Sequence, residues 1–150
     1  MYNDTITLFN AHNDDSKAMH WYPSVLRNVN LNMDRASIVA KFGAESQDKV
    51  VLNVRYHLRD GKKMVGDKIW LPPKEWKRQA VDSLTGSLTF ASGQEFDFFY
   101  VGEWPDAELI SENAYPDGFY NHMNKQYDFV FAITADSCYS VIPHFEIMGR

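Results

Sequence analysis

Hydrophobic and polar residues alternate over much of this chain, which is typical of strands that are buried on one side. The clearest case is residues 49–58, where Val50, Leu52 and Val54 fall on one face and mostly charged or polar residues fall on the other. Residues 28–33 repeat the alternation with three asparagines, which are poor helix formers. The pattern predicts roughly nine strands. They cover residues 5–9, 20–26, 28–33, 49–58, 69–71, 87–91, 96–101, 127–134 and 139–147.

Three short segments indicate helices instead. Residues 34–42 can form a helix capped by Asp34, with Gly43 where a left-handed C-terminal residue belongs. Apolar residues in this segment also alternate, so a strand is the alternative there. Prolines suited to a first helical turn predict a helix over residues 72–76, and residues 116–125 have room for two turns.

Most connections between the predicted strands are too short for a parallel crossover, so the strands are expected to pair antiparallel. We predict a mainly β, single-domain antiparallel β-barrel or sandwich with two or three short helices. A barrel is the better prediction, because closure removes exposed strand edges. The length of 150 residues is that of one domain. Turn residues occur at 59–62 and 92–94, and an exposed acidic segment is expected at 103–112.

Net charge, the length of apolar stretches and the cysteine count restrict the partners and the compartment expected for this protein. A net charge of −5 disfavours nucleic acid and anionic membrane surfaces as partners. No stretch has the apolar length of a membrane span, and the first residues lack the pattern of a secretion signal. We therefore expect a protein that is made and kept in the cytoplasm. The single cysteine, Cys138, cannot form an internal disulfide and is predicted to pack as a small buried hydrophobe.

Motifs that carry chemistry are missing from the sequence. It has no phosphate-binding or dinucleotide glycine pattern, no zinc-protease motif and no serine nucleophile elbow. His144 and Glu146 come nearest to a metal-ligand pair, but a polar strand face is the favoured interpretation. Glu95 and Asp97 would share a strand face and are candidates for paired acid catalysis, with a solvated acidic face as the alternative. We predict no catalytic residue, no metal and no cofactor.

Two basic segments and one acidic segment indicate a subunit interface. Residues 59–63 and 74–78 are basic, and the acidic segment includes Glu103 and Glu112. A basic surface on one copy can meet an acidic surface on its neighbour. A single-strand nucleic-acid groove with Trp76 as a stacking platform is the alternative. The candidate interface residues are Arg59, Lys62, Lys63, Trp76, Lys77, Arg78, Trp104, Asp106 and Glu108.

Taken in order, the segments of the chain resemble a known family. The matching stretches are 5–10 (Thr5-Ile6-Thr7-Leu8-Phe9-Asn10), 21–29, 50–58, 70–76 (Trp70-Leu71-Pro72-Pro73-Lys74-Glu75-Trp76), 88–93, 98–102 and the ending 133–149. They are similar to the small head-to-tail joining proteins of tailed bacteriophages, the stopper or head-closure type often labelled minor capsid proteins. Uncharacterised phage and prophage proteins are the most similar. Residues 104–126 are longer than a compact stopper needs.

This resemblance implies a structural role in the head-tail connector. Such a protein would seal the portal, dock the tail and form a ring homo-oligomer, with portal, adaptor and tail components as partners. It could be a monomer when alone, and would pass from the host cytoplasm into the virion. Residues 59–66 are a candidate mobile loop, and an ordinary exposed hairpin is the alternative there.

The rival hypothesis is a ligand- or glycan-binding β domain, including a hydrolytic one, with an aromatic and acidic cleft. The residues suspected in that case are Glu95, Asp97, Trp70, Trp76 and Trp104.

Overall fold

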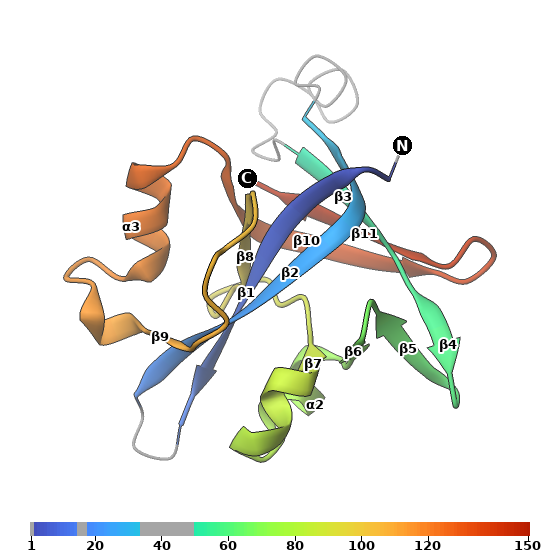
Figure 1. Cartoon of the computed structure of the whole chain (residues 1–150), viewed down its shortest axis with the longest axis horizontal. Coiled ribbons are helices and arrows are strands. Elements are labelled where there is room, and N and C mark those ends of the chain that lie inside the picture. The colour runs from blue at the N-terminus through green and yellow to red at the C-terminus, as the bar shows by residue number, and fades with distance from the viewer. Residues whose placement is uncertain (1, 15–17, 34–49) are drawn as a thin grey trace.

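The structure is a computed structural model that describes residues 2–14, 18–33 and 50–150. The helix predicted at 34–42 lies outside the described residues. Figure 1 shows the order of the elements along the chain. The strands are β1 (Asp4–Asn13), β2 (Met19–Asn32), β3 (Val50–Arg55), β4 (His57–Arg59), β5 (Lys62–Val65), β6 (Lys68–Trp70), β7 (Ser87–Leu88), β8 (Phe98–Val101), β9 (Ile110–Ser111), β10 (Val130–Tyr139) and β11 (His144–Gly149). The helices are α2 (Pro73–Lys77) and α3 (Phe119–Gln126), with 3₁₀ turns at Val81–Gly86 and Glu112–Ala114.

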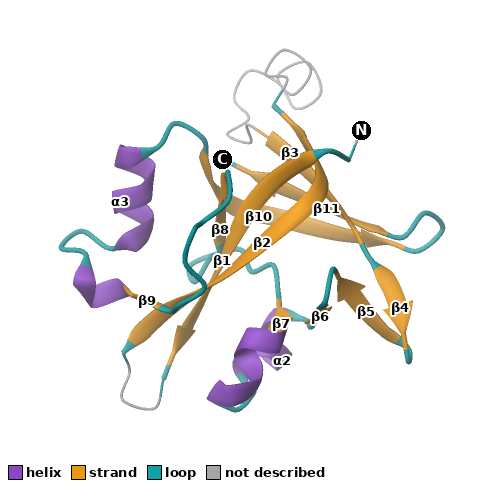
Figure 2. Cartoon of the chain, in the orientation of Figure 1, coloured by secondary structure: helices purple, strands orange, loops and turns teal. Residues whose placement is uncertain are grey.

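Six strands form a closed barrel, so the predicted mainly antiparallel β-barrel is confirmed. Hydrogen-bonded neighbours follow the order β1-β8-β10-β11-β3-β2, and pairing between β2 and β1 closes the ring. Every pairing in this ring is antiparallel. The short β9 pairs with β2 at His20 and Trp21, along the edge of β2 that does not pair with β1. Figure 2 shows these strands crossing at the centre of the molecule, with the helices on its outside.

Strand β2 is one long strand where the pattern predicted two. Its first part pairs with β1, and Asn30–Asn32 pair with β3. Between these parts Asn28 has φ 57°, and the β1 register shifts between Asp4 and Thr5. Asparagine tolerates this left-handed conformation better than most residues. The irregularity therefore bends β2 from one barrel neighbour to the other without ending the strand.

The segment predicted as one strand at 49–58 divides at Tyr56. The Tyr56 side chain is buried, and its hydroxyl donates to the carbonyl of Tyr139 at 2.9 Å. Beyond it, β4 leaves the barrel and joins a second sheet in the order β4-β5-β6-β7. Leu58, which continues the alternation of the apolar residues of β3 and would share their buried face in one straight strand, is 65% exposed. The strand predicted at 87–91 is only the two residues of β7, which pair with β6 in parallel.

Strands β10 and β11 also differ from their predicted bounds. The segment predicted at 127–134 begins at Val130 and continues to Tyr139, while β11 begins only at His144. The two strands form a hairpin whose far end extends beyond the barrel (Figure 1). The prediction that Cys138 is buried is therefore wrong, because its thiol lies in this extension and is exposed. The last five residues of β10 are all exposed.

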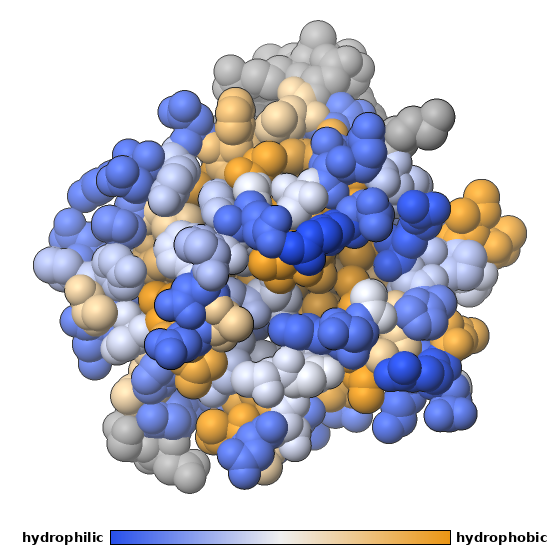
Figure 3. All heavy atoms as spheres, viewed as in Figure 1, coloured by the Kyte–Doolittle hydropathy of each residue, from blue (hydrophilic) through white to orange (hydrophobic). Residues whose placement is uncertain are grey.

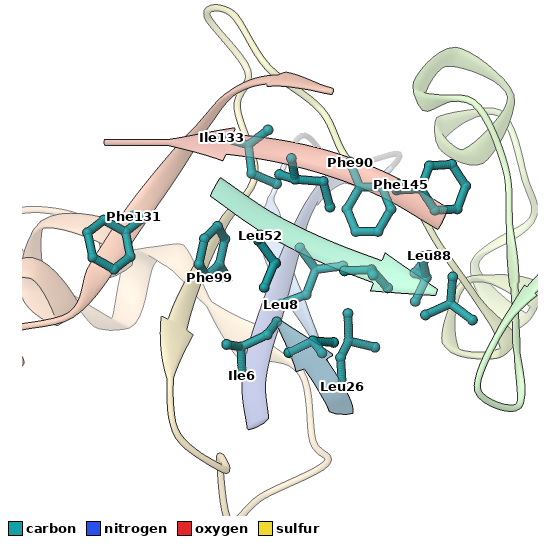
Figure 4. Close-up of a cluster of buried hydrophobic side chains, with 14 of the residues drawn as sticks. Ile6, Leu8, Leu26, Leu52, Leu88, Phe90, Phe99, Phe131, Ile133 and Phe145 are labelled. Atoms are coloured by element: carbon teal, nitrogen blue, oxygen red, sulfur yellow. The ribbon is translucent and has the colours of Figure 1, made fainter. Parts of the chain in front are cut away.

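The barrel interior holds the main hydrophobic cluster. Alternate residues of β3, Val50, Leu52 and Val54, are each 1% exposed, as the period of two requires. Figure 4 shows side chains from several strands converging on this interior, together with Phe90 from the loop after β7, whose ring centroid is 5.2 Å from that of Phe145 in β11. Full burial of one such side chain contributes about 1.5–3 kcal/mol. The cluster therefore fixes the barrel to which the outer segments attach.

The two helices predicted at 72–76 and 116–125 are present as α2 and α3. Helix α3 lies outside the barrel and places Phe119 and Met123 in a second cluster with Phe9, Trp21 and Phe98. Helix α2 buries Trp76 in a third, smaller cluster. Among the described residues, no helix combines the length and apolar character needed to cross a membrane.

Candidate functional site

A buried carboxylate, Asp97, joins three segments of the barrel wall. Its Oδ1 accepts a hydrogen bond from the Ala11 amide at 2.9 Å. Its Oδ2 accepts from Asn10 Nδ2 at 2.8 Å and from the Ala91 amide at 3.0 Å. The Asp97 carbonyl in turn accepts from the Ile133 amide at 3.0 Å. One residue thus ties β1, the segment before β8, and β10 together.

Full burial governs the protonation of this carboxyl. Burial raises the pKa of Asp97 to about 7, while the N–H donors and the charge of Lys77 act in the opposite direction. The prediction that Asp97 and Glu95 present adjacent carboxylates on one face is wrong. Asp97 is fully buried, whereas Glu95 is exposed and bonds Lys77 Nζ at 2.9 Å. That bond lowers the pKa of Glu95. The two acids therefore do not form a catalytic pair.

A cleft with a volume of about 610 Å³ lies beside the segment that carries Asp97. Its walls come from the far end of the β1–β2 hairpin, from residues 94–96, from the end of α2 and from residues 112–121. This volume is within the range of small-molecule sites in proteins. The lining residues are Ala11, His12, Asn13, Met19, Trp21, Lys77, Gln94, Glu95, Phe96, Glu112, Asp117, Gly118, Tyr120 and Asn121.

Aromatic rings form part of the cleft wall. Phe96 and Tyr120 pack edge to face with ring centroids 4.9 Å apart, and both are only partly buried. Burial raises the pKa of the Tyr120 hydroxyl, so this group stays protonated. Trp21 is 3% exposed and lies deeper in the wall. The cleft therefore combines a rigid aromatic pair with a tryptophan behind it.

Glu112 links the deep wall of the cleft to α3. Its Oε1 accepts from Trp21 Nε1 at 3.1 Å and from the Phe119 amide, at the start of α3, at 2.7 Å. The preceding Gly118 has φ 88°, and a Cβ there would lie 3.1 Å from Glu112 Oε2. This glycine allows the chain to turn tightly around the carboxylate. Glu112 was expected in an exposed acidic segment, but it is half-buried and positions the helix.

The other side chains of the cleft are mostly polar. His12 Nε2 lies 3.1 Å from the Lys77 carbonyl, and Asn121 Nδ2 donates to the Asp117 carbonyl at 2.8 Å. Within the described part of the chain, the side-chain amides of Asn13 and Gln94 bond no protein group. These amides offer donors and acceptors at the mouth of the cleft.

The three tryptophans suspected in a ligand cleft belong to the packed interior instead. Trp76 is fully buried and meets Tyr22 edge to face at 5.8 Å. Trp104 packs against Phe9 at 5.4 Å, and Trp70 against Phe145 at 4.9 Å. None of the three lines the cleft. Full burial also removes Trp76 from the candidate interface, whereas Trp104 is only partly buried and stays a candidate.

The basic interface candidates lie in two separate places. Arg59, Lys62 and Lys63 belong to the β4–β5 hairpin, where Lys63 Nζ lies 5.6 Å from the centre of the Trp70 ring. Arg78 and Lys77 instead lie at the end of α2, and Lys77 faces the cleft. The candidate mobile loop at 59–66 includes the turn of the β4–β5 hairpin, at Asp60 and Gly61.

The acidic interface candidates Asp106 and Glu108 are exposed, as expected. Asp106 Oδ1 accepts from the Glu108 amide at 2.9 Å, which stabilises the local turn. Glu103, at the start of the same segment, pairs with Arg27 of β2. In Figure 1 this segment runs down the left half of the view toward β9, whereas the β4–β5 hairpin lies at the right. The two charged surfaces are thus on different sides of the molecule.

A third exposed feature is the end of the β10–β11 hairpin. Val141 is 96% exposed, Ile142 69% and Tyr139 45%. Figure 3 shows hydrophobic atoms at the right edge of the view, where this hairpin ends. The pattern predicted one strand over residues 139–147, whereas the chain turns between Tyr139 and His144, so this exposed turn was not expected.

The His144–Glu146 pair does not form part of a larger ligand set. His144 stacks on Tyr139 with ring centroids 4.8 Å apart, and its Nδ1 lies 2.6 Å from the Ile142 carbonyl. Within the described residues, no three His, Cys, Asp or Glu side chains gather as a metal site requires.

Fold and cleft together define a small antiparallel β-barrel protein with an acidic, aromatic-lined cleft in its outer wall. The chain belongs to a family described as a family of unknown function (DUF6751), whose model matches residues 1–150. No curated protein matches it, and no solved structure does.

Proposed function

We propose that this protein is a structural component of a phage head-tail connector that assembles into a ring, seals the portal and docks the tail. The observation that carries the proposal is the separation of charge. Basic residues occupy the β4–β5 hairpin, and acidic residues occupy the segment before β9 on a different side of the barrel (Figure 1). Such a surface pair can repeat from copy to copy in a head-to-tail contact, which closes into a ring when the rotation allows.

The end of the β10–β11 hairpin supplies a surface of a different kind. Val141 and Ile142 are highly exposed apolar residues on an extended arm. Apolar side chains that are exposed in the free protein are commonly buried when a partner binds. In the proposed connector, this arm contacts a portal, adaptor or tail component. The resemblance of the sequence to head-tail joining proteins supports the same assignment, with assembly in the host cytoplasm followed by a place in the virion.

A charge-reversal experiment tests the ring contact. Lys62 and Glu108 are exposed and have no side-chain partner in the described part of the chain. Lys62→Glu and Glu108→Lys should each weaken self-association, and the double variant should restore it, because the contact recurs at every interface of the ring. Native mass spectrometry at low salt measures the oligomer, since added salt screens exposed charges. Equal assembly by all variants would remove this contact from the proposal.

Genetics tests the biological role. Virions induced from a host that carries the gene should contain the protein, as mass spectrometry can detect. Deletion of the gene should give tailless or DNA-leaking heads by negative-stain electron microscopy. Virions without the protein, together with normal head-tail joining in the deletion strain, would overturn the connector proposal.

A second candidate function is ligand or glycan binding, and the cleft is the observation that favours it. The walls are Phe96, Tyr120 and Trp21 rather than the tryptophans first suspected. Hydrolysis by Glu95 and Asp97 loses its basis, since Asp97 does not line the cleft. We therefore propose binding without catalysis at this site.

A further inference from the structure

We propose that the cleft binds a short, uncharged oligosaccharide along the aromatic pair of Phe96 and Tyr120. This inference deepens the second candidate function and is independent of the connector proposal. It rests on the shape of the surface, on the groups that line it and on its charge.

The shape favours an extended ligand. A second hollow, also of about 610 Å³, lies on the other side of the aromatic pair and shares Gln94, Phe96 and Tyr120 with the first. A third, of about 360 Å³, shares Lys77 and Glu95 with the cleft. These hollows continue one another around the segment at 92–96. A chain of several sugar rings could therefore occupy successive positions with the aromatic pair near the middle.

The lining groups match the two-sided chemistry of a pyranose. The C–H face of a sugar ring is apolar and packs on aromatic rings such as those of Phe96 and Tyr120. Sugar hydroxyls both donate and accept, as do the side-chain amides of Asn13 and Gln94. Within the described residues these two amides bond no other protein group. They are exposed and ready to bond a ligand without first breaking an internal hydrogen bond.

Charge disfavours anionic ligands. The cleft is lined by Lys77 and by three acidic residues, Glu95, Glu112 and Asp117. Lys77 is already paired with Glu95 at 2.9 Å. Asp117 is paired with Lys125 at 3.2 Å. Glu112, whose partners are the N–H groups of Trp21 and Phe119, is therefore the lining carboxylate whose charge a phosphate, sulfate or nucleotide would meet. An uncharged saccharide avoids this repulsion, and its hydroxyls can donate to the same carboxylate oxygens.

A peptide fits the walls less well. Extended peptides bind mainly through backbone hydrogen bonds at a free strand edge, or as proline-rich helices in aromatic grooves. In the cleft, the β1 and β2 backbones pair with each other over residues 12–13 and 19–20, and α3 satisfies its own backbone. The surface consequently presents mostly side chains, and its backbone groups are limited to the short edge of β1 beyond Phe9, where β8 no longer pairs with it.

The test is a titration of the ¹⁵N-labelled full chain, followed by NMR, with cellotriose, maltotriose, mannotriose and the trimer of N-acetylglucosamine. At least one trisaccharide should give saturable shifts of the Asn13 and Gln94 side-chain amides, with a Kd of about 1 mM or tighter. Gln94→Ala should weaken that binding by about tenfold, since it removes a hydrogen bond worth about 1.4 kcal/mol. Tyr120→Ala should weaken it further.

The variant Gln94→Ala and a control variant make the titration interpretable. Gln94 is exposed, so its truncation should leave the fold intact even if Tyr120→Ala weakens the second hydrophobic cluster. Tyr139→Ala, an exposed aromatic on the distant hairpin, is the matched control and should bind like the wild type. Absence of saturable shifts with all four sugars would overturn the proposal. So would binding of a proline-rich peptide in their place, or sugar binding that is unchanged in Gln94→Ala. Ring assembly is measured separately and does not depend on these results.

Discussion

Replacing Asp97 is the sharpest test of how the barrel wall is held together. In Asp97→Ala, the amides of Ala11 and Ala91 lose their acceptor inside the protein, and Asn10 Nδ2 keeps only the Thr89 carbonyl. Each buried donor without a partner costs about 1–3 kcal/mol. Removal of a carboxyl whose ionised form burial disfavours offsets part of this loss. We expect a net loss of about 3–6 kcal/mol in the free energy of unfolding, which is a large part of the total for a domain of this size.

Asp97→Asn separates hydrogen bonding from charge. The amide keeps one oxygen acceptor but turns an NH₂ group toward one of the three donors, so the loss should be smaller, about 1–3 kcal/mol. The pH dependence follows from the raised pKa of about 7. Because the folded protein holds this proton more tightly than the unfolded chain, the resulting stability is complete below the ordinary pKa of 3.8 and disappears as the pH rises through 7. The advantage of wild type over Asp97→Asn should therefore shrink between about pH 4 and pH 8.

Urea unfolding followed by tryptophan fluorescence measures these changes in free energy, because Trp21 and Trp76 are buried in the folded protein and become exposed to water on unfolding. Asp106→Asn, an exposed aspartate, is the control and should change stability by less than about 0.5 kcal/mol. A loss below about 1 kcal/mol in Asp97→Ala would refute the role of Asp97 as a buried acceptor. An advantage over Asp97→Asn that grows with pH would instead mean that the three donors outweigh burial.

Three further changes probe other parts of the molecule. Asn28→Val should destabilise the barrel by about 1–2 kcal/mol, because a β-branched residue resists a φ of 57°, whereas Asn28→Gly should be nearly neutral in the same urea assay. Lys77→Ala should leave stability almost unchanged but raise the pKa of Glu95, as an NMR titration of its side chain can show. Val141→Ser combined with Ile142→Ser should preserve the melting temperature, since both side chains are exposed, and should reduce binding of the hydrophobic dye ANS.

The alternation of residues along the chain was sufficient to predict a mainly antiparallel β domain, because a period of two directly reports which face of a strand is buried. The barrel was favoured over the sandwich because closure removes exposed strand edges. Strand β3 illustrates this, with Val50, Leu52 and Val54 all inside. Alternation does not report where a strand changes partner. The pattern continues through Leu58 although the chain leaves the barrel at Tyr56. It also gave no sign that β2 is continuous, since the bend at Asn28 interrupts the period without interrupting the strand.

The cleft could not be predicted from spacing, because its walls come from four separate parts of the chain. Nothing in the sequence brings Tyr120 to Phe96, or Glu112 to Trp21. The aromatic residues that looked suited to a cleft were tryptophans, but the largest side chains are also the most effective at filling a core, as Trp76 does. The error over Cys138 has a related origin: strand patterning cannot indicate that a hairpin extends beyond the layer that would cover it.

The proposed functions use different surfaces of one scaffold, so each can fail without the other. Lys62 and Glu108 lie on the β4–β5 hairpin and in the segment before β9, and neither lines the cleft. Asp97 connects the scaffold to the cleft, since it directly follows Glu95 and Phe96 and is tied to β1 at Ala11. Weakening the hydrogen bonds of the Asp97 carboxylate should therefore weaken saccharide binding while leaving the charged contact surfaces in place. Asp97→Asn, under conditions where it remains folded, should reduce the NMR response to sugars more than it reduces ring assembly.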